Sequence, residues 1–371
     1  MTAARRWCVV GLGVLLLVSA PVVVRAVPAP DSGVSANALL SAIRGSDRVA
    51  YSGYAESDGT VHLPVTNEFE STAALFGERT RLRVWWRGAD DWRVSKLRTT
   101  GETGLFHDGT GTTRWVYESA RATRTPIVRV RLPDVSDLVP PVLARHLLTG
   151  TRRSEVTRLP AERIAGRDAP GLRLVPSDPR STIAHVDVWA DPSTGVPVRV
   201  LVYGDGEDAP VMSTAFDQLT TEVPAAATTR FEPPPGTDLR FDDTVDLAAA
   251  ADRFAPVSPP VRLAGLDRRG DLAGAAGVYG RGPTVLLAVP LWGRVADRLD
   301  EQLAAAPGAE AMPYGTRLAA GPLRLLLARP GLHDRSWLLI GTVTARTLHT
   351  AASQLTDRGF DRGFDRGDDR R

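Results

Sequence analysis

Residues 184–202 read AHVDVWADPSTGVPVRVLV, and this stretch decides the fold class. Valine or alanine occupies every second position on both sides of the segment 191–195, which contains aspartate, proline and glycine. Apolar side chains with a period of two, interrupted by turn-forming residues, are typical of an antiparallel hairpin with one buried face. The stretch therefore predicts two paired strands whose valines face a core.

The same pattern occurs earlier in the chain. Leu82, Val84 and Trp86 alternate with arginines and Trp85, a turn rich in glycine and aspartate follows, and 92–97 leads back. A further pair flanks the Asp-Gly turn at 108–109. Because an unpaired buried arginine is costly, we expect the arginine face to be solvated and Leu82, Val84 and Trp86 to point inward.

Two helices are expected among these strands. Ser35 is a good N-cap residue, and Leu39, Leu40 and Ile43 follow it at helical spacing before a glycine at position 45. A second helical segment is expected near 141–148, between the groups of hairpins.

The pattern changes after the proline-rich segment 231–236. Strands are expected at 284–291, 323–328 and 337–343, with helices at 295–303 and from Thr344 to Leu355, which indicates a mixed α+β unit. The charged tail repeats Phe-Asp-Arg-Gly and is expected to be disordered. The predicted organisation is a signal segment at 1–26, a linker at 27–34, an N-terminal domain at 35–241, a small C-terminal domain at 242–355 and a disordered tail at 356–371.

The first 26 residues have the layout of an export signal. Arg5 and Arg6 precede an apolar run from Cys8 to Val24, and Ala26 offers a small residue for cleavage. An uncleaved membrane anchor is the alternative, since the run of 17 residues is at the short end for a membrane-spanning helix. Both interpretations place the body of the protein in the extracytoplasmic cell envelope or outside the cell.

The composition argues against several classes of function. The chain of 371 residues has a formal net charge of +2, which provides no strong positive field for binding nucleic acid. Lys96 is the only lysine, and Cys8 is the only cysteine. After the signal segment there is thus no disulfide, thiolate nucleophile or thiolate metal ligand.

No catalytic motif stands out. The chain lacks His-Glu-x-x-His, Gly-x-Ser-x-Gly and a phosphate-binding P-loop, and no two of its six histidines lie at metal-ligand spacing on one element. His185 shares a strand face with Asp187 and Trp189, and a hydrogen-bonded surface histidine is the favoured interpretation. The chain is interpreted as a non-enzymatic protein without a catalytic residue, a metal site or a cofactor.

The ordered motifs of residues 35–241 resemble those of the LolA-like superfamily. That family includes the lipoprotein carriers LolA and LolB, the lipoprotein LppX and the sigma-E regulatory protein RseB, also called MucB. Its sequence motif Asp-x-x-Thr-Gly-Leu-Pro joins two late strands and is matched by Asp191, Thr194, Gly195, Val196 and Pro197. Its closing motif Phe-x-x-Pro-x-Gly is matched by Phe231, Pro234 or Pro235, and Gly236. RseB adds a smaller C-terminal domain, so the layout of this chain is closest to that of RseB.

The resemblance implies a mainly β fold: a curved, incomplete antiparallel β-barrel with helices on its concave side, followed by the small α+β domain. It also implies an apolar cavity for lipid or lipoprotein acyl chains and, for RseB-like proteins, a membrane-bound anti-sigma factor as partner. The residues expected to line the cavity are Leu82, Val84, Trp86, Trp115, Tyr117, Val186 and Val188.

Two hypotheses about function stay open at this point, besides a less favoured third one, a hydrolase acting on envelope material. In the first, the chain binds acyl chains in the cavity and regulates envelope-stress signalling through the anti-sigma factor. In the second, the C-terminal domain docks onto a membrane protein and the sheet is only a scaffold. The sequence does not show whether the cavity is open or filled by side chains.

Overall fold

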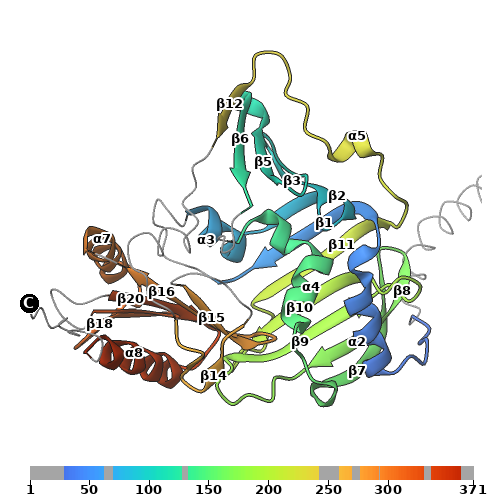
Figure 1. Cartoon of the computed structure of the whole chain (residues 1–371). Coiled ribbons are helices and arrows are strands. Elements are labelled where there is room, and N and C mark those ends of the chain that lie inside the picture. Colours follow the sequence, from blue (N-terminus) through green and yellow to red (C-terminus); the bar gives the residue numbers. More distant parts are fainter. Residues whose placement is uncertain are drawn as a thin grey trace, which may run out of the picture.

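The computed structural model describes residues 29–61, 70–127, 133–241, 259–269, 276–291, 293–329 and 336–360. They form a large sheet carrying helices and a smaller domain beside it (Figure 1). The predicted export signal at 1–26 lies outside the described residues. No helix in the described part of the chain is long and apolar enough to cross a membrane.

Twelve strands form one sheet in the N-terminal domain, in the order β12-β6-β5-β4-β3-β2-β1-β11-β10-β9-β8-β7. The first and last strands are not neighbours, so the sheet does not close into a barrel. Neighbouring strands are antiparallel, except that β12 runs parallel to β6. The strands are β1 (Tyr51–Gly59), β2 (Thr80–Gly88), β3 (Asp91–Arg98), β4 (Gly101–His107), β5 (Gly111–Val116), β6 (Arg121–Pro126), β7 (Val156–Ile164), β8 (Arg167–Leu174), β9 (Ile183–Ala190), β10 (Pro197–Gly204), β11 (Met212–Thr220) and β12 (Asp238–Phe241).

The hairpin expected from residues 184–202 is confirmed as β9 and β10. Val188 lies opposite Val200 in the ladder, and both side chains are fully buried. One carboxylate oxygen of Asp191 accepts hydrogen bonds from the backbone N–H groups of Ser193 and Thr194, each at 2.9 Å. These bonds hold the turn closed and explain why aspartate begins it.

Two helices pack on the concave face of this sheet, as expected (Figure 1). Helix α2 (Ala36–Gly45) begins after Ser35, whose hydroxyl accepts a hydrogen bond from the backbone N–H of Ala38. Helix α4 (Pro140–Leu148) begins with two prolines, which suit the first turn because its N–H groups have no helical partner. Both helices bury apolar side chains in one core with the inward residues of the sheet.

A third helix, α3 (Glu70–Gly77), was not expected from the sequence. It lies against β1, where Gly59 makes the close approach possible. A Cβ atom at Gly59 would lie 2.1 Å from the carbonyl oxygen of Phe76, so any larger residue would push the helix away. The same carbonyl accepts a hydrogen bond from the backbone N–H of Val61 at 2.9 Å.

The C-terminal domain is a sheet with one helix on each face. Its strands run in the order β15-β16-β20-β19-β18-β17. Helix α8 packs with Leu339 of β20, whereas α7 packs with the neighbouring Leu338, because successive strand residues point to opposite faces. The elements are β15 (Gly277–Arg281), β16 (Thr284–Leu291), α7 (Gly293–Ala304), β17 (Glu310–Met312), β18 (Gly315–Ala320), β19 (Leu323–Ala328), β20 (Ser336–Gly341) and α8 (Ala345–Phe360), after a small ribbon of β13 (Arg262–Leu263) and β14 (Leu266–Asp267).

Helix α8 extends through Phe360, so its last turn lies inside the segment 356–371 that was expected to be disordered. The helix that starts after Thr344 continues past Leu355 because no proline or capping glycine interrupts it there. Residues 361–371 lie outside the described part of the chain.

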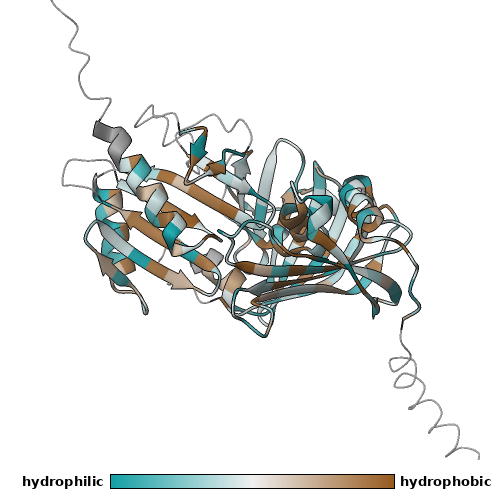
Figure 2. Cartoon of the chain, turned by 90° about the horizontal axis from the view of Figure 1, so that it is seen from below, coloured by the Kyte–Doolittle hydropathy of each residue, from teal (hydrophilic) through white to brown (hydrophobic). Residues whose placement is uncertain are grey.

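The two domains meet along a polar seam. Arg281 of β15 donates to both carboxylate oxygens of Glu155, each at 2.6 Å. Backbone hydrogen bonds add to the seam: the N–H of Gly282 donates to the carbonyl of Thr149, and the N–H of Thr182 to that of Thr342. Each domain has a buried apolar cluster of its own, and Ala320 of the C-terminal domain also packs in the N-terminal cluster. Figure 2 shows hydrophobic stretches along strands of both sheets.

Candidate functional site

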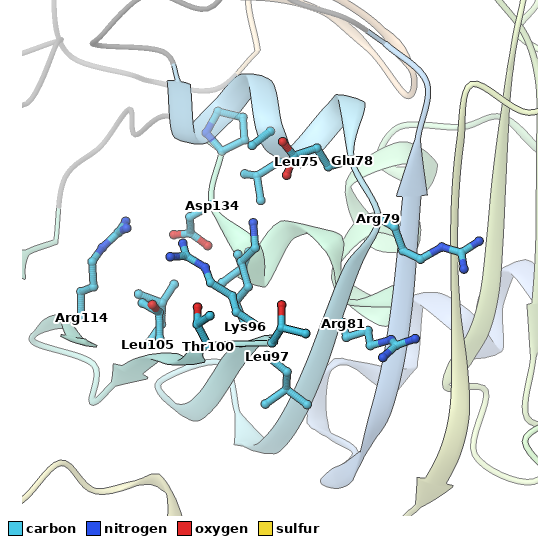
Figure 3. Close-up of a pocket in the computed structure, with 16 residues that line it drawn as sticks. Leu75, Glu78, Arg79, Arg81, Lys96, Leu97, Thr100, Leu105, Arg114 and Asp134 are labelled. Carbon is cyan, nitrogen blue, oxygen red and sulfur yellow. The ribbon is translucent and has the colours of Figure 1, made fainter. Parts of the chain in front are cut away.

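A hollow of about 920 Å³ opens on the concave side of the sheet. It lies between strands β2–β5 and two covering segments, helix α3 and the short helix η3 (Val135–Leu138) (Figure 3). Its volume falls within the range usual for small-molecule sites. The lining consists of Ala74, Leu75, Glu78, Arg79, Arg81, Lys96, Leu97, Arg98, Thr99, Thr100, Thr103, Leu105, Arg114, Pro133, Asp134 and Val135.

The apolar part of the lining comes from three elements. Leu105 of β4 lies opposite Val94 in the ladder and shares its inward face. Leu75 reaches the hollow from α3. Val135 is held by the cap of η3, where Asp134 accepts a hydrogen bond from the backbone N–H of Ser136 at 2.8 Å.

Three cations share this inward face. Lys96 and Arg98 follow Val94 at intervals of two along β3, and Arg114 of β5 lies opposite Leu105. Lys96 and Arg114 point into the same space below α3 (Figure 3). None of the three has a hydrogen-bond or ion-pair partner in the described part of the chain.

The environment of Lys96 is unusual for a lysine. Burial lowers the pKa of its amine, the Arg98 charge lowers it further, and Glu78 opposes both effects. An anion placed between these cations would relieve their repulsion. The other two arginines at the rim are already compensated, because Arg79 and Arg81 both pair with Glu56 on β1.

The arrangement suits an amphiphile with a negatively charged group. Apolar chains favour contact with Leu75, Leu105 and Val135, since burying them removes apolar surface from water. A carboxylate or phosphate would pair with the uncompensated cations. The described residues hold no group of three His, Cys, Asp or Glu side chains placed to bind a metal ion.

The residues predicted from the sequence to line a cavity do not lie in this hollow. Leu82, Val84 and Trp86 do face the concave side, while Arg81 and Arg83 of the same strand are exposed, as expected. Val186 and Val188 also face inward, from β9. The structure brings these five predicted residues into the close-packed core under the helices, beside the hollow instead of around it.

The last two predicted residues lie elsewhere. Trp115 pairs in register with Gly104 and Ala122 and points to the convex face, where Phe231 covers it. Tyr117 follows β5 in a turn of 3₁₀ helix and is 42% exposed. Their rings contact each other with centroids 5.6 Å apart, on the face opposite to Val84.

Sequence reasoning missed Leu75, Leu105, Lys96 and the other residues that line the hollow. A signal for Lys96 was present, because it continues the inward period of Trp92 and Val94 and is the only lysine in the chain. No local pattern could have identified Leu75, since α3 was not predicted.

His185 is partly buried and is positioned by ring stacking; the hydrogen bond expected of a surface histidine is not found among the described residues. Its ring stacks on that of Tyr203 at 4.1 Å between centroids. Burial lowers the pKa of the imidazole, and the charge of Arg173 lowers it further. Asp187 makes its main bonds with Arg173, two of 2.7 Å, and lies 3.9 Å from the histidine.

Comparisons with known proteins concern the fold. No family model and no curated protein matches the sequence. A chain of the Pseudomonas aeruginosa MucA/MucB complex is similar in structure, with 16% identity, a TM-score of 0.48, and coverage of 85% of this chain and 96% of that one. MucB alone has 16% identity, a TM-score of 0.46, and coverage of 86% and 96%. A LolA superfamily protein from Nitrosomonas europaea has 14% identity, a TM-score of 0.25, and coverage of 54% and 99%. All three are similar to this chain at 16% identity or less and at TM-scores below 0.5.

Proposed function

We propose that the chain is an exported, non-enzymatic binding protein that holds an anionic amphiphile in the hollow between β2–β5, α3 and η3. The observation that carries the proposal is a cavity of about 920 Å³ that combines an apolar lining with Lys96, Arg98 and Arg114. These three cations have no hydrogen-bond or ion-pair partner among the described residues, and they outnumber the two carboxylates of the inner lining, Glu78 and Asp134. An acyl chain would contact Leu75, Leu105 and Val135. Its charged group would bind to Lys96, Arg98 and Arg114.

The chemistry of the ligand follows from the hollow. A purely apolar molecule would leave the cations unpaired, and a purely polar anion would leave the partly exposed Leu97 and Val135 in contact with water. Lipids and lipoproteins with a phosphate or carboxylate near an acyl chain satisfy both parts. The proposal therefore narrows the acyl-chain binding implied by the sequence resemblance to negatively charged amphiphiles.

The experiment is equilibrium binding of a fluorescent fatty acid to the purified mature chain. We expect saturable binding, with affinity reduced by Lys96→Glu and capacity reduced by Thr103→Trp, which would fill the hollow from the sheet. Arg48→Glu is the matched control, since Arg48 is exposed and does not line the hollow. If neither native mass spectrometry nor the fatty acid shows a bound amphiphile, the proposal is wrong.

A second candidate function is docking to a membrane-bound protein, with the anti-sigma partner implied by the resemblance as the example. MucB, one of the structures similar in fold, was solved in complex with MucA(peri). In this chain Val295 of α7 is 59% exposed, although Leu299 and Leu303 of the same helix are buried. Cross-linking from membranes should capture a partner with the full chain and not with Val295→Asp. Equal capture by both would exclude this surface.

A further inference from the structure

One carboxylate of the hollow has no ion-pair partner. Glu78 lies in the short connection between α3, which ends at Gly77, and β2, which begins at Thr80. It lines the hollow on the side of α3 (Figure 3). No cation among the described residues pairs with it. A negative charge in a site proposed for an anion requires an explanation, because it repels the head group of the ligand.

The backbone is held in place on both sides of Glu78. On one side, the carbonyl of Phe76 accepts a hydrogen bond from the backbone N–H of Val61 at 2.9 Å. On the other side, Thr80 pairs with Ser57 in the ladder between β1 and β2 and is 1% exposed. The backbone at Glu78 is therefore fixed beside the hollow, and its carboxylate acts on any head group bound there.

The charge of Glu78 reaches the cations on the floor of the hollow. Burial and the charge of Arg98 lower the pKa of the Lys96 amine, whereas the Glu78 carboxylate raises it. An anion bound at Lys96 would be subject to the same carboxylate with the opposite sign. The last carbonyl groups of α3, just before Glu78, add partial negative charge on this side of the hollow.

The hollow has a single positive charge in excess. Three cations and two carboxylates belong to its inner lining: Lys96, Arg98, Arg114, Glu78 and Asp134. The two arginines of the rim are already paired with carboxylates of β1. A head group with one negative charge neutralises the excess. A second negative charge on the ligand would find no further excess cation and would be repelled by Glu78.

We propose that Glu78 determines the charge of the ligand: the hollow selects a head group with one negative charge, a carboxylate or a phosphodiester, over a doubly charged phosphate monoester. This inference rests on the proposed function and narrows its class of ligand. Repulsion by Glu78 grows with the charge of the head group, so it weakens the binding of a dianion more than that of a monoanion. Selectivity of this kind is a difference between two affinities, and a repulsive group can supply it.

The test compares dodecyl phosphate with its methyl ester as competitors of the fluorescent fatty acid on the mature chain, below their micelle concentrations and at constant ionic strength. A phosphate monoester loses its second proton near pH 6, so dodecyl phosphate carries one negative charge at about pH 5 and two at about pH 8, whereas the ester carries one at both. We expect equal affinities at the lower pH. At the higher pH dodecyl phosphate should bind more weakly than the ester, on the order of tenfold. The ester corrects for titration of the protein itself.

Two variants assign the effect to Glu78. Glu78→Gln keeps the size of the side chain and removes its charge, so the difference between the two ligands at the higher pH should disappear. Glu207→Gln removes an exposed carboxylate that does not line the hollow and should leave the difference unchanged.

The outcomes separate this inference from the proposed function. Equal affinities of the wild-type chain for both ligands at the higher pH, or an unchanged difference in Glu78→Gln, would overturn the inference alone. Weaker binding of both ligands by Glu78→Gln would mean that Glu78 attracts a cationic part of the ligand or supports the site, and would overturn it too. If neither ligand displaces the fatty acid at either pH, the proposed function itself is wrong.

Discussion

Replacing Glu155 with glutamine should weaken the seam between the two domains. The Glu155 carboxylate accepts two hydrogen bonds from Arg281, two from Ser177 and one from the backbone N–H of Arg152, at distances from 2.6 to 3.0 Å. Its side chain is 2% exposed and that of Arg281 is 30% exposed. In Glu155→Gln the amide nitrogen would face a donor, and the guanidinium would lose its counter-charge.

The size of the effect follows from this burial. Removing one partner of a fully buried ion pair costs about 3–5 kcal/mol. Water reaches Arg281 from one side, so we expect a smaller loss of about 2–3 kcal/mol in the free energy of unfolding. Glu162→Gln is the matched control, because its pair with Arg199 is more exposed, at 40% and 35%, and such pairs contribute less than about 1 kcal/mol.

The same pair predicts a pH dependence. Burial alone would raise the pKa of the Glu155 carboxyl, but the bonds from Arg281, Ser177 and Arg152 outweigh it and hold the pKa well below its usual range. Its contribution to stability is thus complete above the unfolded pKa, about 4.3, and is lost as the pH falls below that value toward the folded pKa. In Glu155→Gln the free energy of unfolding should therefore depend less on pH in this acidic range.

Urea unfolding followed by tryptophan fluorescence measures both effects. The pH range should run from about 3, roughly one unit below the unfolded pKa of the glutamate, to about 7. A double-mutant cycle with Arg281→Met isolates the pair itself. If Glu155→Gln lowers the free energy of unfolding by less than about 1 kcal/mol at neutral pH, the pair does not hold the domains together. The same follows if the pH dependence of stability in the acidic range is unchanged.

Three further predictions follow from the described contacts. Val84→Trp should destabilise the fold by roughly 1–3 kcal/mol in urea unfolding, because Val84 is fully buried in a close-packed core; an unchanged stability would mean that space exists there. Ser35→Ala should cost about 1 kcal/mol through loss of the α2 cap, whereas Ser32→Ala, outside the helix, should cost nothing; equal effects would show that the cap is unimportant. Lys96→Glu should reduce the affinity for an anionic acyl probe on the order of tenfold with little change in stability, and a variant that binds as wild type would remove Lys96 from the site.

Much of the fold could be predicted because its signals are local. Period-two valines predicted β9 and β10, and the Ser35 cap with Leu39, Leu40 and Ile43 predicted α2. The strands 284–291 and 323–328 were predicted with the bounds that the structure shows. Such signals depend on neighbouring residues, and tertiary contacts did not override them.

The site was harder to predict, because it depends on register and on distant contacts. The rule that an arginine face is solvated is right for β2, where Arg83 points outward. In β5 the same rule fails: Arg114 points inward to a polar hollow, and Trp115 points outward because Gly104 and Ala122 leave room beside it and Phe231 covers it. Nothing in the sequence near Trp115 indicates this reversal.

The polar contacts between the two domains could not be predicted from the sequence for the same reason. Glu155 and Arg281 are 126 residues apart in the chain, and each lies in a segment without a distinctive pattern. Helix α3 has only eight residues, and its place depends on the absence of a side chain at Gly59. Contacts of this kind require the three-dimensional arrangement.

We propose that an amphiphile occupies the hollow and not the close-packed core beside it. The most direct measurement is methyl NMR of the mature chain with a fatty acid that carries a nitroxide along its acyl chain. We expect strong broadening of the methyl signals of Leu75, Leu105 and Val135, with those of Val186 and Val188 unchanged. Broadening of the Val186 and Val188 signals instead, or of none of the five, would contradict it.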